Sequence, residues 1–163
     1  MTKAHGISGP RPAGPRIGIA LGSGSARGWA HIGVLRALQD ADIEPDVVCG
    51  TSIGALVGGA YVSRRLDAVE SWARSIRWLD IVRLLDVNLT RGGFIQGTRI
   101  FDAFRALQPN VRIEDLAKPF AAVATDFATG REVWLQHGSL MEAVRASSSL
   151  PGVFPPKGFQ AGD

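Results

Sequence analysis

The pentapeptide Gly50-Thr51-Ser52-Ile53-Gly54 constrains the fold more than any other stretch, because of what stands on either side of it. The apolar run Val47-Val48-Cys49 precedes it, and a run of small and apolar residues at 55–60 follows. A G-x-S-x-G segment between a strand and a helix is typical of a nucleophile elbow, a strained turn whose glycines avoid collisions with neighbouring backbone. The sequence therefore predicts that Ser52 lies exposed at the carboxyl end of a strand, facing the positive end of the next helix dipole.

A glycine-rich loop, Gly22-Ser23-Gly24-Ser25-Ala26-Arg27-Gly28, follows the apolar run Arg16–Leu21, which is expected to be a buried strand. Such a loop directs several backbone N–H groups to one point, which suits a phosphate or an oxyanion. A P-loop would end in Gly-Lys-Ser/Thr, and a dinucleotide fingerprint would read G-x-G-x-x-G with an acidic residue closing the next strand. Here Arg27 takes the sixth position and the next strand ends in Cys49-Gly50, so nucleotide binding is disfavoured. A purely structural turn remains an alternative.

The order of these elements predicts where the two loops meet. Apolar residues at threefold spacing indicate a helix over Trp29–Gln39, and Asp46–Gly50 is the second strand. A strand, helix and strand in this order form a right-handed unit with parallel strands, whose carboxyl ends share one edge of the sheet. The Gly24–Gly28 backbone is therefore expected close to the Ser52 hydroxyl. We interpret His31, in the first turn of the helix, as structural rather than catalytic.

The rest of the chain is expected to add helices and a hairpin. Apolar spacing predicts helices at 66–76, 78–85 and 98–107, with a flexible loop at 91–97. Two β-like runs, Phe120–Thr125 and Arg131–Gln136, predict a hairpin with Gly130 at its bend. Ser139 and Glu142 form a capping box for the helix that follows.

Length and composition indicate one domain, at 163 residues with 45% apolar residues and a formal net charge of +3. Residues 1–15 are rich in glycine and proline and lack the apolar core of a signal peptide, so we expect a disordered leader before a domain at 16–163. The single cysteine, Cys49, lies in an apolar strand and favours a reducing, cytoplasmic compartment.

The charges and motifs of the sequence limit the kinds of partner that the chain is expected to bind. Arginine supplies 15 of the 18 basic residues, and a solvated helical face is the simplest explanation. An anionic membrane surface or an acidic substrate is the functional alternative, and would give peripheral membrane contact. No interleaving of aromatic and basic residues indicates nucleic acid, and no group of histidines, cysteines or carboxylates has metal-ligand spacing.

A serine nucleophile needs a base and donors for the oxyanion. The chain order allows a triad of Ser52, Asp126 and His137, as in α/β-hydrolases. We disfavour this triad because Asp126 and His137 stand at the two ends of one hairpin and the chain is short for that fold.

Several stretches together resemble the patatin-like phospholipases, especially compact bacterial members similar to the catalytic part of neuropathy target esterase. They are Gly22–Gly28 with the following W-A-H-I-G-V-L, Gly50–Gly54, Asp126–Gly130, and Ser147–Pro156 with the sequence S-S-S-L-P-G-V-F-P-P. The resemblance runs from about Arg16 to Pro156. It implies an α/β fold, a three-layer sandwich with a mainly parallel central sheet.

The resemblance also implies a function, the hydrolysis of phospholipid or lysophospholipid esters by a Ser-Asp dyad without a cofactor. Ser52 would be the nucleophile, and Gly50 and Gly54 would form its elbow. The oxyanion hole would consist of the backbone N–H groups of Gly24, Ser25, Ala26, Arg27 and Gly28. Arg27 would steady the hole or meet a lipid phosphate.

The chain departs from the family's pattern at two places. Ser23 and Ser25 stand where the family often has glycine. The family's base is the aspartate of an Asp-Gly-Gly or Asp-Gly-Ala motif, which this sequence does not contain. By the resemblance the domain is incomplete at its C-terminus, Asp163 is a turn residue, and activity is impaired. The rival hypothesis is a non-catalytic lipid or membrane-surface binding module that keeps the loop and the elbow.

Overall fold

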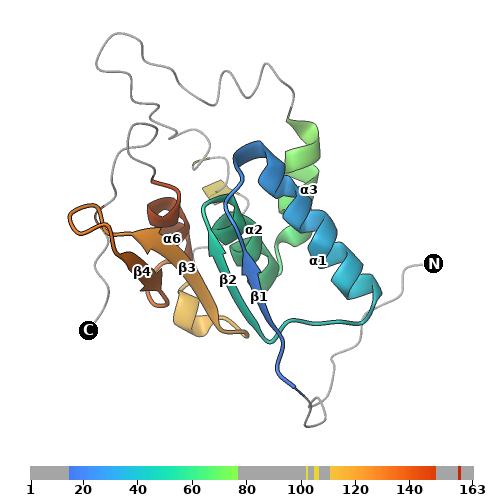
Figure 1. The fold of residues 1–163 in the computed structure, drawn as a ribbon. Helices are drawn as coiled ribbons and strands as arrows, with labels where there is room; N and C mark the ends of the chain where they lie inside the picture. Colours follow the sequence, from blue (N-terminus) through green and yellow to red (C-terminus); the bar gives the residue numbers. More distant parts are fainter. Residues whose placement is uncertain (1–14, 77–101, 103–104, 107–110, 150–157, 159–163) are drawn as a thin grey trace.

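The computed structural model describes residues 15–76, 102, 105–106, 111–149 and 158 (Figure 1). These residues contain a four-stranded sheet in the order β1-β2-β3-β4. Its strands are β1 (Gly18–Leu21), β2 (Val47–Thr51), β3 (Phe120–Thr125) and β4 (Glu132–Leu135). The pairs β1–β2 and β2–β3 are parallel, and β3–β4 is antiparallel, so the sheet is mainly parallel as predicted.

The helices carry the labels of Figure 1. They are α1 (Ala30–Asp40), α2 (Ile53–Val62), α3 (Leu66–Ser75) and α6 (Leu140–Ser147), with 3-10 turns η1 (Ser25–Trp29) and η2 (Ile113–Asp115). The predicted hairpin and the helices near 29–39, 66–76 and 139–146 are confirmed, except that Trp29 belongs to η1. Ser139 caps α6, since its Oγ accepts the N–H of Glu142 at 3.4 Å.

Several predictions from the sequence lie wholly or largely outside the described residues. They concern the leader, the helices at 78–85 and 98–107, the loop at 91–97, and the turn expected at Asp163. Of the predicted third helix, Asp102, Arg105 and Ala106 are described and are helical.

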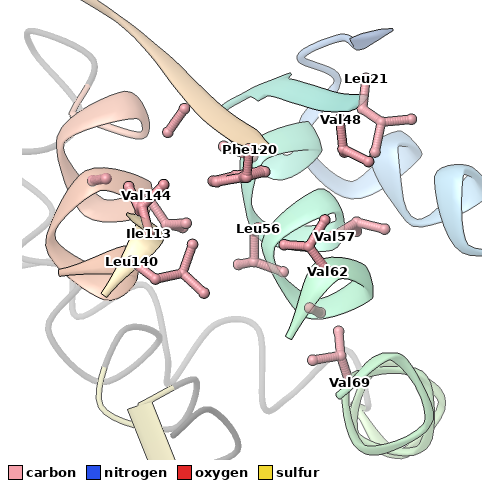
Figure 2. Close-up of a cluster of buried hydrophobic side chains, with 14 of the residues drawn as sticks. Leu21, Val48, Leu56, Val57, Val62, Val69, Ile113, Phe120, Leu140 and Val144 are labelled. Carbon is pink, nitrogen blue, oxygen red and sulfur yellow. The ribbon is translucent and has the colours of Figure 1, made fainter. Parts of the chain in front are cut away.

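Helix α2 lies at the centre of the fold. Eight of its ten residues are buried, because its sequence is apolar on every side and a helix of that kind must be covered all round. Figure 2 shows Leu56, Val57 and Val62 of α2 between neighbours from the sheet, from α3 and from α6. Phe120 and Val48 come from the strands, and Leu140 and Val144 come from α6.

The alternation of side chains along the strands separates the two faces of the sheet. Val48 and Leu135 are buried on the face that α2 covers. The strands β1, β2 and β3 lie side by side in chain order, so right-handed crossovers place α1 and α2 on this same face. Val47 and Trp134 point to the opposite face, and are 37% and 49% exposed. A mainly parallel sheet flanked by helices is consistent with the predicted α/β three-layer sandwich.

Within the described ranges, no helix is both long and apolar enough to cross a bilayer.

Replacing Val57 by alanine is expected to destabilise the protein by about 2 kcal/mol, because its side chain is fully buried and the core can close the resulting gap only in part. Val34→Ala is the matched control, since Val34 lies on α1 and is 49% exposed; its cost is expected to stay below about 0.5 kcal/mol. Urea unfolding followed by circular dichroism measures the free energy of unfolding of both variants. Equal losses of stability would contradict the burial of Val57 in the core.

Candidate active site

Ser52 occupies a strained turn between β2 and α2. Strand β2 ends at Thr51 and α2 begins at Ile53, so the whole reversal falls on one residue with φ 55° and ψ −119°. A non-glycine residue outside the favoured regions costs about 1–3 kcal/mol and persists only where its surroundings impose it. Ser52 is half-buried, at the N-terminus of α2. The turn lies where the sequence predicted an elbow, with Ser52 half-buried rather than exposed.

The two flanking glycines are required by close contacts between backbones. A Cβ on Gly50 would lie 2.4 Å from the carbonyl carbon and oxygen of Gly54. A Cβ on Gly54 would lie 2.0 Å from the carbonyl oxygen of Leu21, at the end of β1. These neighbours are main-chain atoms, which cannot move aside as the end of a long side chain can. The first turn of α2 therefore sits directly on the ends of β1 and β2.

The glycine-rich loop lies against the elbow, as the topology predicted. A Cβ on Gly28 would meet the Ile53 side chain at 2.1 Å, and the carbonyl oxygen of Gly22 is 2.6 Å from the position of a Gly54 Cβ. Both ends of the loop thus contact residues that directly follow Ser52. Residues 22–27 are exposed, and the leading N–H groups of a helical turn such as η1 have no carbonyl partner inside it.

Three contacts determine the conformation of this loop. The Arg27 N–H donates to the Gly24 carbonyl at 3.0 Å, closing the 3-10 turn. The Nε2 atom of His31 lies 2.9 Å from the Gly22 carbonyl oxygen, and that carbonyl can only accept, so the bond requires a proton on Nε2. The Trp29 ring packs edge-on against Trp72 of α3, with centroids 5.8 Å apart. The bond of His31 to the loop backbone supports its interpretation as a structural residue.

The loop has a strained residue of its own. Ser25 has φ 49°, in the left-handed region that glycine adopts without cost. The sequence comparison with the family's pattern pointed to this same position as one where glycine is common. At this position a serine therefore carries a backbone strain that glycine would not have.

One contact at the elbow was not foreseen from the sequence. The Ser52 N–H donates to Ser147 Oγ at 2.9 Å, and Ser147 Oγ donates to the Val123 carbonyl at 2.5 Å. Ser147 ends α6 and is 95 residues from Ser52 in the chain, so no local pattern could have joined them. The only sign of its importance in the sequence was that Ser147 begins the stretch Ser147–Pro156, which resembles the family.

The Ser52, Asp126 and His137 triad is not assembled. Asp126 belongs to the hairpin turn, where its Oδ1 accepts the Thr129 N–H at 2.7 Å and the Thr129 hydroxyl at 2.8 Å. His137 follows the antiparallel strand β4, in which Leu135 pairs with Ala122. It therefore lies toward the other end of the sheet, about four residues or 13 Å from the level of Ser52 at 3.3 Å per residue. The sequence-based doubt about this triad is confirmed.

The hydrogen bonds at Asp126 also affect its ionisation. Both bonds from Thr129, first from its hydroxyl and then from its backbone, favour the charged carboxylate and hold the pKa of Asp126 below its usual range. A carboxylate used in this way stabilises a turn. In the described residues, no group of three or more histidines, cysteines and carboxylates is placed to hold a metal ion.

These features define an α/β protein with a strained serine turn between a strand and a buried helix. A glycine-rich loop packs on that turn. The family profile described as patatin-like phospholipase matches residues 19–161, which is most of the chain. The chain belongs to the patatin-like phospholipase family. This membership confirms the family that the motifs indicated.

Relatives with curated names agree with this assignment. An NTE family protein of Mycobacterium tuberculosis is 45% identical over 142 residues, which cover 87% of this chain. A patatin-like phospholipase domain-containing protein of Caenorhabditis elegans is 37% identical over 148 residues, and the neuropathy target esterase of Drosophila melanogaster is 36% identical over 149. Each of these two matches covers 88% of this chain. The matched region is 39% of the mycobacterial protein and 11% and 10% of the two animal proteins, so the chain spans a minor part of each.

The contacts of Gly54 predict a large effect of a single methyl group. Gly54→Ala is expected to destabilise the protein by about 3 kcal/mol or more, because the backbone of α2 must move away from β1. Gly33→Ala is the matched control, since a Cβ on this α1 residue meets nothing within 4 Å. There the change should stabilise by about 0.5–1 kcal/mol, through the lower entropy of the unfolded chain. Urea unfolding of both variants provides the measurement, and a Gly54→Ala protein as stable as the wild type would refute this packing.

The lowered pKa of Asp126 predicts a dependence of stability on pH. A group whose pKa is lower in the folded state stabilises that state above its unfolded pKa, and the contribution is lost as pH falls through the folded value. Asp126→Ala should therefore lower the melting temperature at pH 7, and this difference should shrink as the solution is acidified through the carboxyl range. A difference that does not change with pH would show that the Asp126 charge has no part in the turn.

Proposed function

We propose that this chain carries the nucleophile and the oxyanion hole of a serine hydrolase that cleaves phospholipid or lysophospholipid esters. The observation that carries the proposal is the conformation of Ser52, at φ 55° and ψ −119° at the start of a buried helix. Strain of this kind is retained at functional sites, where it aims a side chain. Membership of the patatin-like phospholipase family, with relatives named as esterases, supports lipid-ester hydrolysis at the level of the family.

The proposed reaction has two steps. The Ser52 hydroxyl loses its proton to a base and attacks the acyl carbonyl carbon, the carbonyl oxygen becomes negative, and the alcohol leaves with a proton. A water molecule then attacks the acyl-serine and releases the fatty acid and the free hydroxyl. Backbone N–H groups of Gly24–Gly28 would stabilise the negative oxygen in both steps, helped by the α2 dipole.

The hydrogen bonds of the elbow support this assignment of the oxyanion hole. In many serine hydrolases an N–H group near the nucleophile contributes to the hole. Here the Ser52 N–H is already donated to Ser147 Oγ. Within the loop the Arg27 N–H is likewise donated, to the Gly24 carbonyl, and Gly28 is buried, so the exposed amides of Gly24, Ser25 and Ala26 are the better candidates.

The base is the part that this sequence does not identify. The family resemblance assigns it to the aspartate of an Asp-Gly-Gly or Asp-Gly-Ala segment, and no aspartate of these 163 residues is followed by glycine. Without that base, positioning and the oxyanion hole still act. In serine proteases these contributions alone give about 10³–10⁴-fold over water. We therefore propose slow turnover by this chain.

Two exposed side chains support a lipid substrate. Arg27 lies in the glycine-rich loop and could pair with a lipid phosphate. Phe127 is 71% exposed in the hairpin turn after β3, at the edge of the sheet that carries Ser52. A cation and an exposed aromatic ring on one edge suit peripheral contact with a membrane surface.

The direct test is hydrolysis of p-nitrophenyl butyrate by the full chain. We expect slow release of p-nitrophenol that is abolished in Ser52→Ala and unchanged in Ser75→Ala, whose hydroxyl donates to the Trp72 carbonyl on the surface of α3. His137→Ala should keep the wild-type rate, since His137 lies away from Ser52.

The same assay tests the missing base. Joining the chain to a following segment that carries Asp-Gly-Gly should accelerate release strongly, and changing that aspartate to asparagine should remove the gain. Hydrolysis that survives Ser52→Ala would contradict the proposal. Absence of any hydrolysis by both the short and the joined chain would favour the non-catalytic binding module instead.

A further inference from the structure

The hydroxyl of Ser147 connects the backbone N–H of the turn residue after β2 to a backbone carbonyl of β3. It accepts the Ser52 N–H at 2.9 Å and donates to the Val123 carbonyl oxygen at 2.5 Å. Ser147 and Ser52 are both half-buried, so water has limited access to replace the hydrogen bond between them. A hydroxyl can do both because it has one proton to donate and lone pairs to accept.

The position of this bridge is set by the pairing of β2 with β3. The Val48 N–H donates to the Pro119 carbonyl at 3.1 Å, and the rungs of a parallel ladder recur at every second residue. Two steps further along, the ladder would join the Ser52 N–H to the Val123 carbonyl. These are the two groups that Ser147 Oγ connects, so the hydroxyl is inserted into the last rung of the ladder.

The inserted hydroxyl gives hydrogen-bond partners to two backbone groups that the turn at Ser52 would otherwise leave without one. At φ 55° and ψ −119°, Ser52 has left the strand conformation, and a direct rung to β3 is not made. Without Ser147, its N–H and the Val123 carbonyl would both lose a partner. The bridging side chain is itself held firmly, since Ser147 is the last residue of α6 and Leu140 and Val144 of that helix are fully buried in the core.

We propose that Ser147 is a positioning residue for the nucleophile. It holds the backbone of Ser52 in the elbow conformation by bonding its N–H, and so fixes where the Ser52 hydroxyl meets an acyl group. This inference rests on the proposed function in one respect, that Ser52 is the nucleophile. The bridge itself does not depend on it.

The neighbouring serines provide matched controls. Ser148 Oγ donates to the Val144 carbonyl and Ser149 Oγ to the Arg145 carbonyl, both at 2.9 Å and both to acceptors in the last turns of α6. Neither of these bonds reaches the elbow. Ser148→Ala and Ser149→Ala therefore remove a hydroxyl from the same half-buried segment without removing the bridge.

The first measurement is the rate at which a fluorophosphonate probe modifies Ser52 in the folded chain, with loss of fluoride. In Ser147→Ala the saturating rate should fall about 10- to 100-fold, as expected when a nucleophile is displaced by a fraction of an ångström to 1 Å. The probe concentration for half-saturation should stay unchanged. Ser147→Thr keeps the hydroxyl and should recover most of the rate, and the two control variants should match the wild type.

The second measurement is hydrogen exchange at the Ser52 amide by NMR, which does not require activity. Exchange should be at least about tenfold faster in Ser147→Ala, since the amide loses its acceptor, and unchanged in the two controls. If Ser147→Ala does not fold, Ser147→Cys replaces it in both experiments, because a thiol fills similar space with a much weaker donor and acceptor.

The outcomes separate the two claims. A folded Ser147→Ala protein that is labelled at the wild-type rate, or that shows unchanged exchange at Ser52, would overturn the positioning role. A wild-type chain that the probe never labels would contradict the proposed hydrolase function and with it the role in catalysis, while faster exchange in Ser147→Ala would still establish the bridge.

Discussion

The contact between the backbone of Gly54 and the carbonyl of Leu21 is the constraint on which the rest of the structure depends. It brings the first turn of α2 onto the end of β1, at a distance that leaves no room for a Cβ atom. The strand before Ser52 and the helix after it can then be joined by a single residue. The same contact brings the start of the glycine-rich loop against the elbow, because Gly22 directly follows Leu21. One close approach thus positions both the serine and the loop that would serve it.

The strain at Ser52 is balanced by interactions from distant parts of the chain. The apolar sequence of α2 buries that helix between the sheet, α3 and α6, which fixes the helical side of the turn. Pairing of β2 with β1 and β3 fixes the strand side. The Ser147 hydroxyl bridges the Ser52 N–H and the Val123 carbonyl, where a direct hydrogen bond between β2 and β3 is not made. The elbow is therefore imposed by the whole fold, which is how a costly backbone conformation can persist.

Local patterns in the sequence predicted most of what surrounds the site. The G-x-S-x-G segment between an apolar run and a small-residue helix specified the elbow, because that spacing suits little else at a strand-to-helix turn. The strand-helix-strand pattern predicted that the first two strands are parallel, with their carboxyl ends at one edge of the sheet. The position of Asp126 and His137 at the ends of a hairpin was enough to disfavour the triad. Antiparallel pairing of β4 then places His137 away from Ser52.

What the sequence could not provide was which individual side chains from distant parts of the chain meet at the site. Ser147 stands among three serines with nothing in the sequence to distinguish it from Ser148 and Ser149. Which of the three faces the elbow depends on the register of α6 against the sheet, and this register is set by packing. The interpretation of His31 had a similar limit, since its bond to the Gly22 carbonyl depends on how the loop turns back over α1.

The proposed function requires that Ser52 and the glycine-rich loop act on one reacting group. The most direct measurement is a crystal structure of the chain after reaction with a diisopropyl fluorophosphonate-type inhibitor, whose phosphoryl oxygen occupies the position of the oxyanion. We expect a covalent bond from phosphorus to Ser52 Oγ, with the phosphoryl oxygen within hydrogen-bonding distance of N–H groups in Gly24–Gly28. Phosphorus bonded to another residue, or a phosphoryl oxygen directed away from that loop, would contradict it.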